Sequence, residues 1–137
     1  MIPRSRVIFY AENNERLLEI VRDVLEFAGW YVKACTDPVY ILPTMQITKQ
    51  HFDLLLIDNE LRNFTGLELV RDIRRIPHRK EMPIILISID DLTEEAREAG
   101  ADAFLRKPNN LIELVDTIRR LLGEERDGEN AKNEAAR

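Results

Sequence analysis

Short apolar runs alternate along the chain with segments of helical periodicity. Most of these runs show no alternation of apolar and polar residues, so they predict strands that are buried on both faces of a sheet. The runs are 7–11 (VIFYA), 31–35 (YVKAC), 54–57 (LLLI), 84–88 (IILIS) and 103–106 (AFLR).

Segments between the runs repeat apolar residues at the spacing of an α-helix. They are 15–28, 66–75, 92–99 and 111–122. Gly29 and Gly100 are placed to end two of these helices. Capping patterns precede the other two: Thr65-x-x-Glu68, and Asn110 with Glu113.

Residues 36–53 should hold one more helix, but two prolines disturb it. Asp37-Pro38 is a good helix start. Pro43 then falls where it would remove a hydrogen bond and clash with the preceding turn, at a cost of about 3 kcal/mol. We therefore predict an interrupted helix, either an irregular turn with a later start at Pro43 or a pronounced kink.

A strand followed by a helix, five times over, predicts an α/β domain. Right-handed crossovers make it a doubly wound, five-stranded parallel sheet with helices on both faces. A chain of 137 residues is long enough for one such domain, which we place at 1–122. The segment 123–137 is acidic and its only apolar residues are alanines, so we predict a disordered tail there.

Composition narrows the class of function. The chain is 45% hydrophobic and 33% charged with a net charge of −5, which is typical of a globular protein. It has no apolar run long enough to span a membrane and no signal-peptide pattern, so we expect a cytoplasmic location and no membrane partner. Charges of both signs are mixed, which argues against direct nucleic-acid binding.

Polar side chains follow the strands at the points where the strands end. Glu12 and Asn13 come after the first run, Asp58 and Glu60 after the third, and Ser88 closes the fourth. Lys107 follows the fifth run. Because the carboxyl ends of parallel strands meet at one edge of the sheet, we expect these groups to lie together. Oxygen ligands there suit Mg²⁺, and a carboxylate beside the ion can act as nucleophile in phosphoryl transfer.

Each of these residues also has a simpler interpretation. Asp and Asn are common after strands because turns and helix caps favour them. Lys107 could be a solvated charge, and Ser88 could bond only to nearby backbone. An unrelated small α/β enzyme using Asp58 and Glu12 is a further alternative, but no Gly-rich phosphate loop or nucleophile elbow supports it.

The chain resembles the receiver domain of two-component response regulators, a flavodoxin-like fold, over residues 6–122. The matching pieces are VIFYAENN for the first strand and acidic pair, DLLLIDNELRNFTGLELV for the phosphoacceptor strand and following helix, MPIILIS, and EAGADAFLRKP. The eight-residue step from Asp58 to Gly66 is also the spacing of that family. The combination is highly specific, although each motif alone is not.

The resemblance implies a role for each residue of the constellation. Asp58 would be the phosphoacceptor, forming an aspartyl phosphate with the help of Lys107 and Ser88. Ser88 and Phe104 would be the switch residues, and the Lys107–Pro108 peptide bond would be cis. The metal ligands for a weakly bound Mg²⁺ would be Glu12, Asn13, Asp58 and the backbone carbonyl of Glu60. Such a domain is not an enzyme in the usual sense, although it assists its own phosphorylation and dephosphorylation.

The implied partners are a histidine kinase or phosphotransfer protein as donor and a downstream protein as target. Signalling would run through protein–protein contact, and a homodimer is left open. No output domain follows in these 137 residues, so both a stand-alone regulator and a fragment of a longer one fit the sequence.

Several positions depart from the pattern of the family. Asn13 stands where a second acid usually touches the metal, so the site loses one negative charge. Arg62 replaces a usual proline, and Thr65 replaces a usual acid. The step from Ser88 to Lys107 is also about one helical turn short, which puts the fourth helix in doubt. A pseudo-receiver, a binding module that is not phosphorylated, is therefore the alternative function.

Overall fold

The computed structural model describes residues 5–108 and 110–124. Five parallel strands form one sheet in the order β2-β1-β3-β6-β7. They are β1 (Val7–Ala11), β2 (Tyr31–Cys35), β3 (Leu54–Asp58), β6 (Ile84–Ser88) and β7 (Ala103–Arg106). The predicted doubly wound α/β fold is confirmed, and each predicted strand lies where its apolar run placed it.

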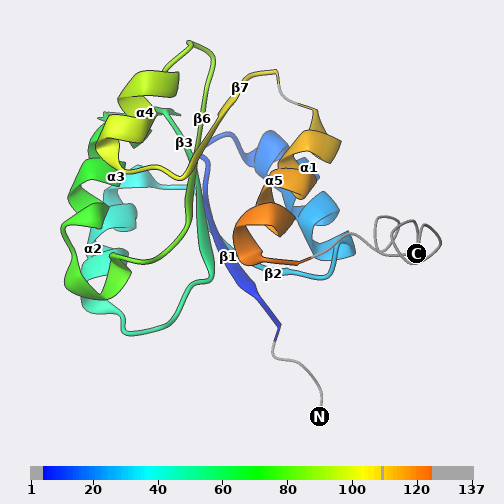
Figure 1. Ribbon diagram of the computed structural model, residues 1–137, viewed down its shortest axis with the longest axis horizontal. Coiled ribbons are helices and arrows are strands. Elements are labelled where there is room, and N and C mark those ends of the chain that lie inside the picture. The colour runs from blue at the N-terminus through cyan, green and yellow to red at the C-terminus, as the bar shows by residue number, and fades with distance from the viewer. Residues whose placement is uncertain (1–4, 109, 125–137) are drawn as a thin grey trace, which may run out of the picture.

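Helices cover both faces of this sheet. Helices α1 (Glu15–Phe27) and α5 (Leu111–Leu122) lie on one side, and α2 (Ile41–Ile47), α3 (Gly66–Arg74) and α4 (Thr93–Ala99) lie on the other (Figure 1). The sheet's side chains divide between the two layers with period two. On β1, for example, Ile8 packs with the α1–α5 layer and Phe9 with the α2–α4 layer. This is why the strand sequences are apolar throughout.

Side-chain caps begin the helices as the sequence predicted. Thr65 Oγ1 accepts a hydrogen bond from the backbone N–H of Glu68 at 3.2 Å, and Asn110 Oδ1 accepts one from Ile112 at 2.7 Å. Gly100, with a φ of 106°, ends α4 in the left-handed conformation that glycine tolerates best. The fourth helix, in doubt from the sequence, does form, but only over seven residues.

The second helix is interrupted, as predicted, but the α-helix does not start at Pro43. A 3₁₀ turn, η1 (Pro38–Tyr40), comes first, and α2 then begins at Ile41. Pro43 is thus the third residue of α2. Backbone N–H groups in the first turn of a helix have no acceptor within it, so a proline there loses no hydrogen bond.

Short elements that the sequence analysis did not predict lie between the main ones. A small hairpin of β4 (Glu60–Leu61) and β5 (Phe64–Thr65) follows the third strand, and a second 3₁₀ turn, η2 (Pro77–Arg79), precedes the fourth. The hairpin turns at Asn63, which has a φ of 66°. The Lys107–Pro108 peptide bond is cis, as the family resemblance implied.

The end of the chain folds slightly beyond the predicted domain boundary. Gly123 ends α5, and Glu124 accepts a hydrogen bond from Trp30 Nε1 at 3.1 Å. Glu124 also lies 3.6 Å from Arg6. The remainder of the predicted tail, 125–137, lies outside the described residues.

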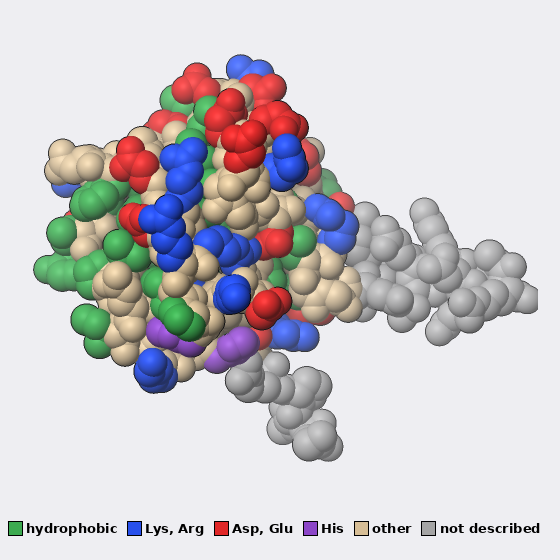
Figure 2. Space-filling view, turned by 60° about the vertical axis from the view of Figure 1, so that its left-hand side comes forward, with side chains coloured by type: hydrophobic (Ala, Val, Ile, Leu, Met, Phe, Trp, Pro, Cys, Tyr) green, Lys and Arg blue, Asp and Glu red, His purple; other side chains and the backbone are tan. Residues whose placement is uncertain are grey.

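The α2–α4 layer carries charges of both signs in separate groups. Figure 2 shows acidic side chains gathered toward the α4 end, where Glu94, Glu95 and Glu98 are exposed, and basic side chains below them. Arg71 of α3 and Arg75, the residue that follows this helix, are exposed. Within 5–108 and 110–124, no helix is both long and apolar enough to cross a membrane.

Candidate functional site

The carboxyl edge of the sheet brings the predicted residues together. Asp58 is the last residue of β3, Ser88 is the last of β6, and Glu12 and Lys107 directly follow β1 and β7. Lys107 Nζ lies 2.7 Å from Asp58 Oδ2, which joins two residues that are 49 positions apart in the sequence. The expectation that the strand ends converge on Asp58 is met by this geometry.

Asp58 is buried, with 3% of its surface exposed, yet both of its oxygens are held. Lys107 donates to Oδ2, and the backbone N–H of Glu60 donates to Oδ1 at 3.1 Å. These two hydrogen bonds fix the orientation of the Asp58 side chain. A buried and oriented carboxylate beside a single ammonium group is a suitable nucleophile.

Gly66 explains the eight-residue step that follows Asp58. Its backbone passes so close to the end of β3 that an added Cβ would collide with the carbonyl oxygen of Asp58 and lie 2.9 Å from Asn59 Cα. The N–H of Gly66 also donates to the carbonyl of Asn59 at 3.0 Å. Only glycine permits this approach, so α3 begins directly against the site.

Glu12 faces Asp58 from the end of β1 and is also only 3% exposed. Burial, together with the nearby charge of Asp58, raises the pKa of Glu12 from 4.5 to about 7, although the backbone N–H of Asn14 and the charge of Lys107 oppose the shift. Two buried carboxylates therefore face each other, and the ammonium group of Lys107 contacts only the one on Asp58 within salt-bridge distance. A cation would relieve this excess of negative charge.

Asn13 supplies an amide oxygen at the same edge. Its Oδ1 atom is buried and accepts no hydrogen bond from the described residues. Buried polar atoms are nearly always paired, so an orphaned oxygen beside two carboxylates fits a hard cation such as Mg²⁺. The described residues contain no group of three His, Cys, Asp or Glu side chains that could hold a metal. Besides the two carboxylates, any ion here would therefore depend on the amide, a backbone carbonyl and water.

The Ser88 hydroxyl is fully buried but is not free to face Asp58. It donates to Glu60 Oε2 at 2.6 Å, and the backbone N–H of Ile89 donates to Glu60 Oε1 at 2.9 Å. The family resemblance implied only a backbone role for Glu60, and this position of its side chain was not predicted. The signal was available, since an acid two residues after a strand-end aspartate must lie near the same edge.

Phe104, the other predicted switch residue, is half-buried on β7. It packs against the core on the α2–α4 side of the sheet, and its register partner on β6 is Leu86. Leu86 lies two residues before Ser88, so the two predicted switch residues lie on neighbouring strands.

A cavity of about 370 Å³ adjoins Asp58 on the α1–α5 side. Its polar rim includes Glu12, Asp58 and Lys107, and its wall includes Tyr10, whose pKa is raised by burial and by the charges of Glu12 and Asp58. Tyr10 was not singled out from the sequence because a tyrosine within a buried strand is ordinary core.

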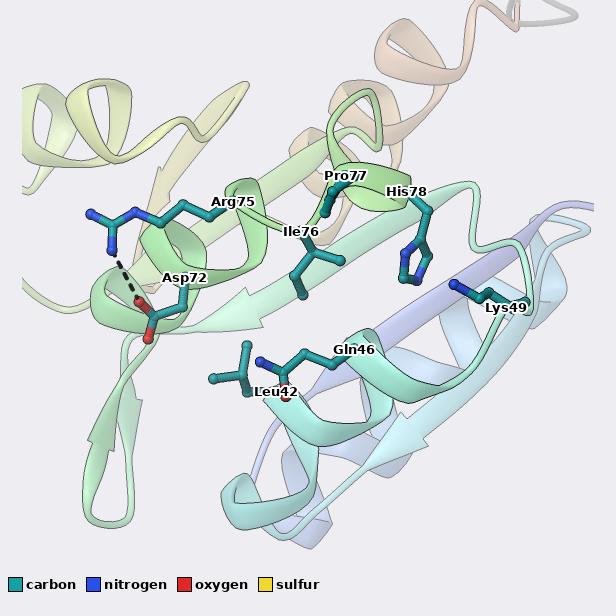
Figure 3. A pocket seen from close by; sticks show the side chains of 8 residues that line it. All are labelled: Leu42, Gln46, Lys49, Asp72, Arg75, Ile76, Pro77 and His78. Carbon is teal, nitrogen blue, oxygen red and sulfur yellow. Dashed lines mark ion pairs between the residues drawn. The ribbon is translucent and has the colours of Figure 1, made fainter.

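A larger and more open hollow, about 900 Å³, lies away from the Asp58 edge, between α2, α3 and η2 (Figure 3). In the figure Leu42 lies on one side of the hollow and Ile76 on the side facing it, with an ion pair between Asp72 and Arg75 near one end. It contains none of the predicted site residues.

Comparison with known proteins agrees with this geometry. A model of the response regulator receiver domain family matches residues 8–119. The polar-differentiation response regulator DivK of Brucella anthropi is 25% identical over 127 residues, which cover 90% of this chain and 99% of that protein.

Solved structures show the same fold. The chemotaxis response regulator CheY4 of Vibrio cholerae has a TM-score of 0.78 and 25% identity, covering 86% of this chain and 99% of that one. The receiver domain of the sensor histidine kinase PA1611 of Pseudomonas aeruginosa, described with a magnesium ion coordinated in its active-site cleft, has a TM-score of 0.76 and 24% identity. That comparison covers 88% of this chain and 100% of that one.

These findings give no support to the pseudo-receiver alternative, because the relatives are named as response regulators. Receiver domains are signalling domains rather than enzymes of the usual kind, and the family typically uses Mg²⁺ and phosphoaspartate. Since the match spans most of the chain and the strand-end residues converge as that fold requires, the chain belongs to the response regulator receiver domain family, whose members signal through phosphorylation in two-component systems.

Proposed function

We propose that Asp58 of this receiver domain accepts the phosphoryl group from the phosphohistidine of a histidine kinase or phosphotransfer protein. A carboxylate oxygen of Asp58 would attack phosphorus while the phosphorus–nitrogen bond breaks and its electron pair returns to the imidazole of the donor. The observation that carries this proposal is the Asp58 carboxylate itself, buried and oriented, with Lys107 Nζ at 2.7 Å.

We assign Mg²⁺ in this chain to Asp58, Glu12, the orphaned Oδ1 of Asn13 and the backbone carbonyl of Glu60. The magnesium described in the PA1611 receiver domain supports an ion of this type in such a cleft. When bound, Mg²⁺ would offset the negative charge that otherwise repels an incoming phosphoryl group. Because Asn13 supplies an amide rather than a carboxylate, we expect the ion to be held weakly.

Lys107 neutralises part of the added charge, since it already contacts the oxygen of Asp58 that faces it. Ser88 would donate its hydroxyl hydrogen to a phosphoryl oxygen, and Phe104 on the neighbouring strand would repack in response. The output would be an altered surface that a downstream protein recognises by direct contact.

Labelling with acetyl phosphate and Mg²⁺ tests the proposal. The wild-type protein should gain one phosphoryl group per chain, and Asp58→Asn should gain none. Asp23→Asn, which changes an exposed acid on α1, is the matched control and should label like the wild type. Undiminished labelling of Asp58→Asn, or no labelling of the wild type, would contradict the proposal.

A further inference from the structure

The side chain of Glu60 holds a position that its backbone role does not explain. Its Oε2 atom accepts hydrogen bonds from Ser88 Oγ at 2.6 Å and from Asn59 Nδ2 at 3.1 Å. Its Oε1 atom accepts one from the backbone N–H of Ile89 at 2.9 Å and lies 3.8 Å from Lys107 Nζ. The carboxylate therefore has four donors around it, drawn from three strand ends.

These contacts hold the Glu60 carboxylate in place. Every group around its two oxygens is a donor, and the Lys107 ammonium is among them. The carboxylate is thus tethered two residues after Asp58 and held by charge-assisted hydrogen bonds.

A phosphoryl group on Asp58 would need some of the same donors. Phosphorylation would replace the single negative charge of the Asp58 carboxylate with a phosphoryl group that carries almost two, beside Lys107 and near Ser88. The Ser88 hydroxyl and the Ile89 amide have one hydrogen each. Neither hydrogen can serve the Glu60 carboxylate and a phosphoryl oxygen with full strength, and the two anions also repel each other.

Asn59 and Arg106 hold the arrangement in place. Asn59 accepts a hydrogen bond from Leu67 at 2.9 Å while it donates to Glu60, so it is tied to the start of α3. Arg106 donates to the carbonyl of Ile89 at 3.1 Å, which fixes the loop that presents the Ile89 amide. The donors are therefore positioned around Glu60 before any phosphoryl group arrives.

We propose that the Glu60 carboxylate is a tethered competitor for the donors of the phosphoryl site, so that Asp58 can be phosphorylated fully only when this side chain moves away. This inference rests on the proposed function, since it assumes that Asp58 is the acceptor. It makes Glu60 a positioning residue that sets how readily the site accepts a phosphoryl group, separately from the backbone carbonyl assigned to the metal.

Two substitutions test the competition. Glu60→Ala removes the carboxylate and leaves the backbone carbonyl, whereas Glu60→Gln keeps the size and removes the charge. Because charge-assisted hydrogen bonds must be given up in the wild type, we expect Glu60→Ala to phosphorylate roughly tenfold faster with acetyl phosphate and Mg²⁺. Glu60→Gln should lie between it and the wild type.

The matched control is Asp90→Asn, which removes an equal charge from an exposed side chain two residues after Ser88. It should stay within about twofold of the wild type, because only the weak long-range part of the electrostatics changes. Binding of beryllofluoride, a phosphoryl mimic, in the presence of Mg²⁺ should follow the same order as the rates. The Ile89 amide proton, observed by NMR, should move upfield in Glu60→Ala and return downfield when beryllofluoride binds.

The outcomes separate the two claims. If Glu60→Ala is labelled at the wild-type rate or more slowly, the competition is overturned and the proposed function stands. Adding Asp58→Asn to Glu60→Ala should abolish the labelling, which shows that the label is on Asp58. If neither the wild type nor any Glu60 variant is labelled or binds beryllofluoride, the proposed function fails and the competition fails with it. Labelling that is slow in the wild type and fast in Glu60→Ala supports both.

Discussion

The two edges of the sheet bury charge in different ways. At the amino edge, the buried guanidinium of Arg79 donates to the carbonyl oxygens of Met45, Thr48 and Gln50 at 3.2, 2.9 and 2.7 Å. It also stacks 4.8 Å from the ring centre of Phe52. One positive charge is thus surrounded by neutral carbonyl acceptors where α2 ends.

At the carboxyl edge, charges of the same sign are brought together. Glu12 and Asp58 face each other, Asn13 Oδ1 has no partner among the described residues, and Lys107 is the ammonium group beside them. The first cluster satisfies its groups and so contributes stability. The second leaves charge uncompensated, which costs stability and prepares the site for a cation and a phosphoryl group.

The largest effect is expected at the amino edge. Arg79→Met keeps the aliphatic stem but removes three donors at once, including the one to the buried Met45 carbonyl, so we expect a loss of about 3 kcal/mol in the free energy of unfolding. Urea denaturation measures it. Labelling of Asp58 in the folded variant should not change, because Arg79 lies at the other edge of the sheet.

Arg75→Met is the control for this experiment. Arg75 is in the same region, but its side chain is 80% exposed and its ion pair with Asp72 is 4.0 Å long. We expect a change below about 0.5 kcal/mol. Similar losses for both variants would show that Arg79 has no special role.

A smaller effect on the free energy of unfolding is expected from pH at the carboxyl edge, where ionisation of a buried group destabilises the fold. The folded-state pKa of Glu12 is about 7 against 4.5 when unconstrained, so the folded protein binds this proton more tightly. Below pH 4.5 the residue contributes nothing to the pH dependence. As pH rises from 4.5 to about 7, the unfolded chain releases this proton before the folded protein does. The free energy of unfolding of the metal-free protein should therefore fall by on the order of 2–3 kcal/mol.

Urea denaturation from pH 5 to 8 with a chelator measures this loss. The difference between the wild type and Glu12→Gln isolates the contribution of Glu12 from that of the groups the two proteins share. Asp58→Asn should reduce the slope, since the charge of Asp58 contributes to the shift. Parallel pH profiles for wild type and Glu12→Gln would show that the carboxyl edge is not under electrostatic strain.

The smallest effect concerns the metal. Asn13→Asp adds a carboxylate to the site, and we expect Mg²⁺ affinity to rise about fivefold, or roughly 1 kcal/mol. Without metal the variant should be less stable, because another carboxylate is added beside Glu12 and Asp58. Isothermal titration measures the affinity.

Asn14→Asp is the matched control for the metal experiment. It adds the same charge one residue later, where the side chain accepts a hydrogen bond from Leu17 N–H and caps α1. Affinity should change less than in Asn13→Asp. An equal gain in both variants would mean that the added charge, rather than a ligand at position 13, is responsible.

The apolar pattern alone determined how the main strands and helices follow one another along the chain, their approximate limits and the fold class. That pattern is local: a doubly covered strand such as 54–57 must be apolar throughout, and a helix such as 111–122 must repeat its apolar face. Caps such as Thr65 and Asn110 were also predictable, because a cap depends on residues three positions away or fewer. The convergence of Asp58, Glu12 and Lys107 followed from the rule that parallel strands end at one edge.

Other features were decided only by contacts between distant segments. The way α2 ends depends on Arg79, which follows the last residue of the helix by more than thirty positions. The raised pKa of Glu12 depends on burial and on Asp58 across two strands. The position of the Glu60 side chain depends on donors at Ser88 and Ile89, at the end of the neighbouring strand. A sequence shows which groups reach the same edge of a sheet, but which donor bonds to which acceptor is settled by distances and burial that only the packed chain defines.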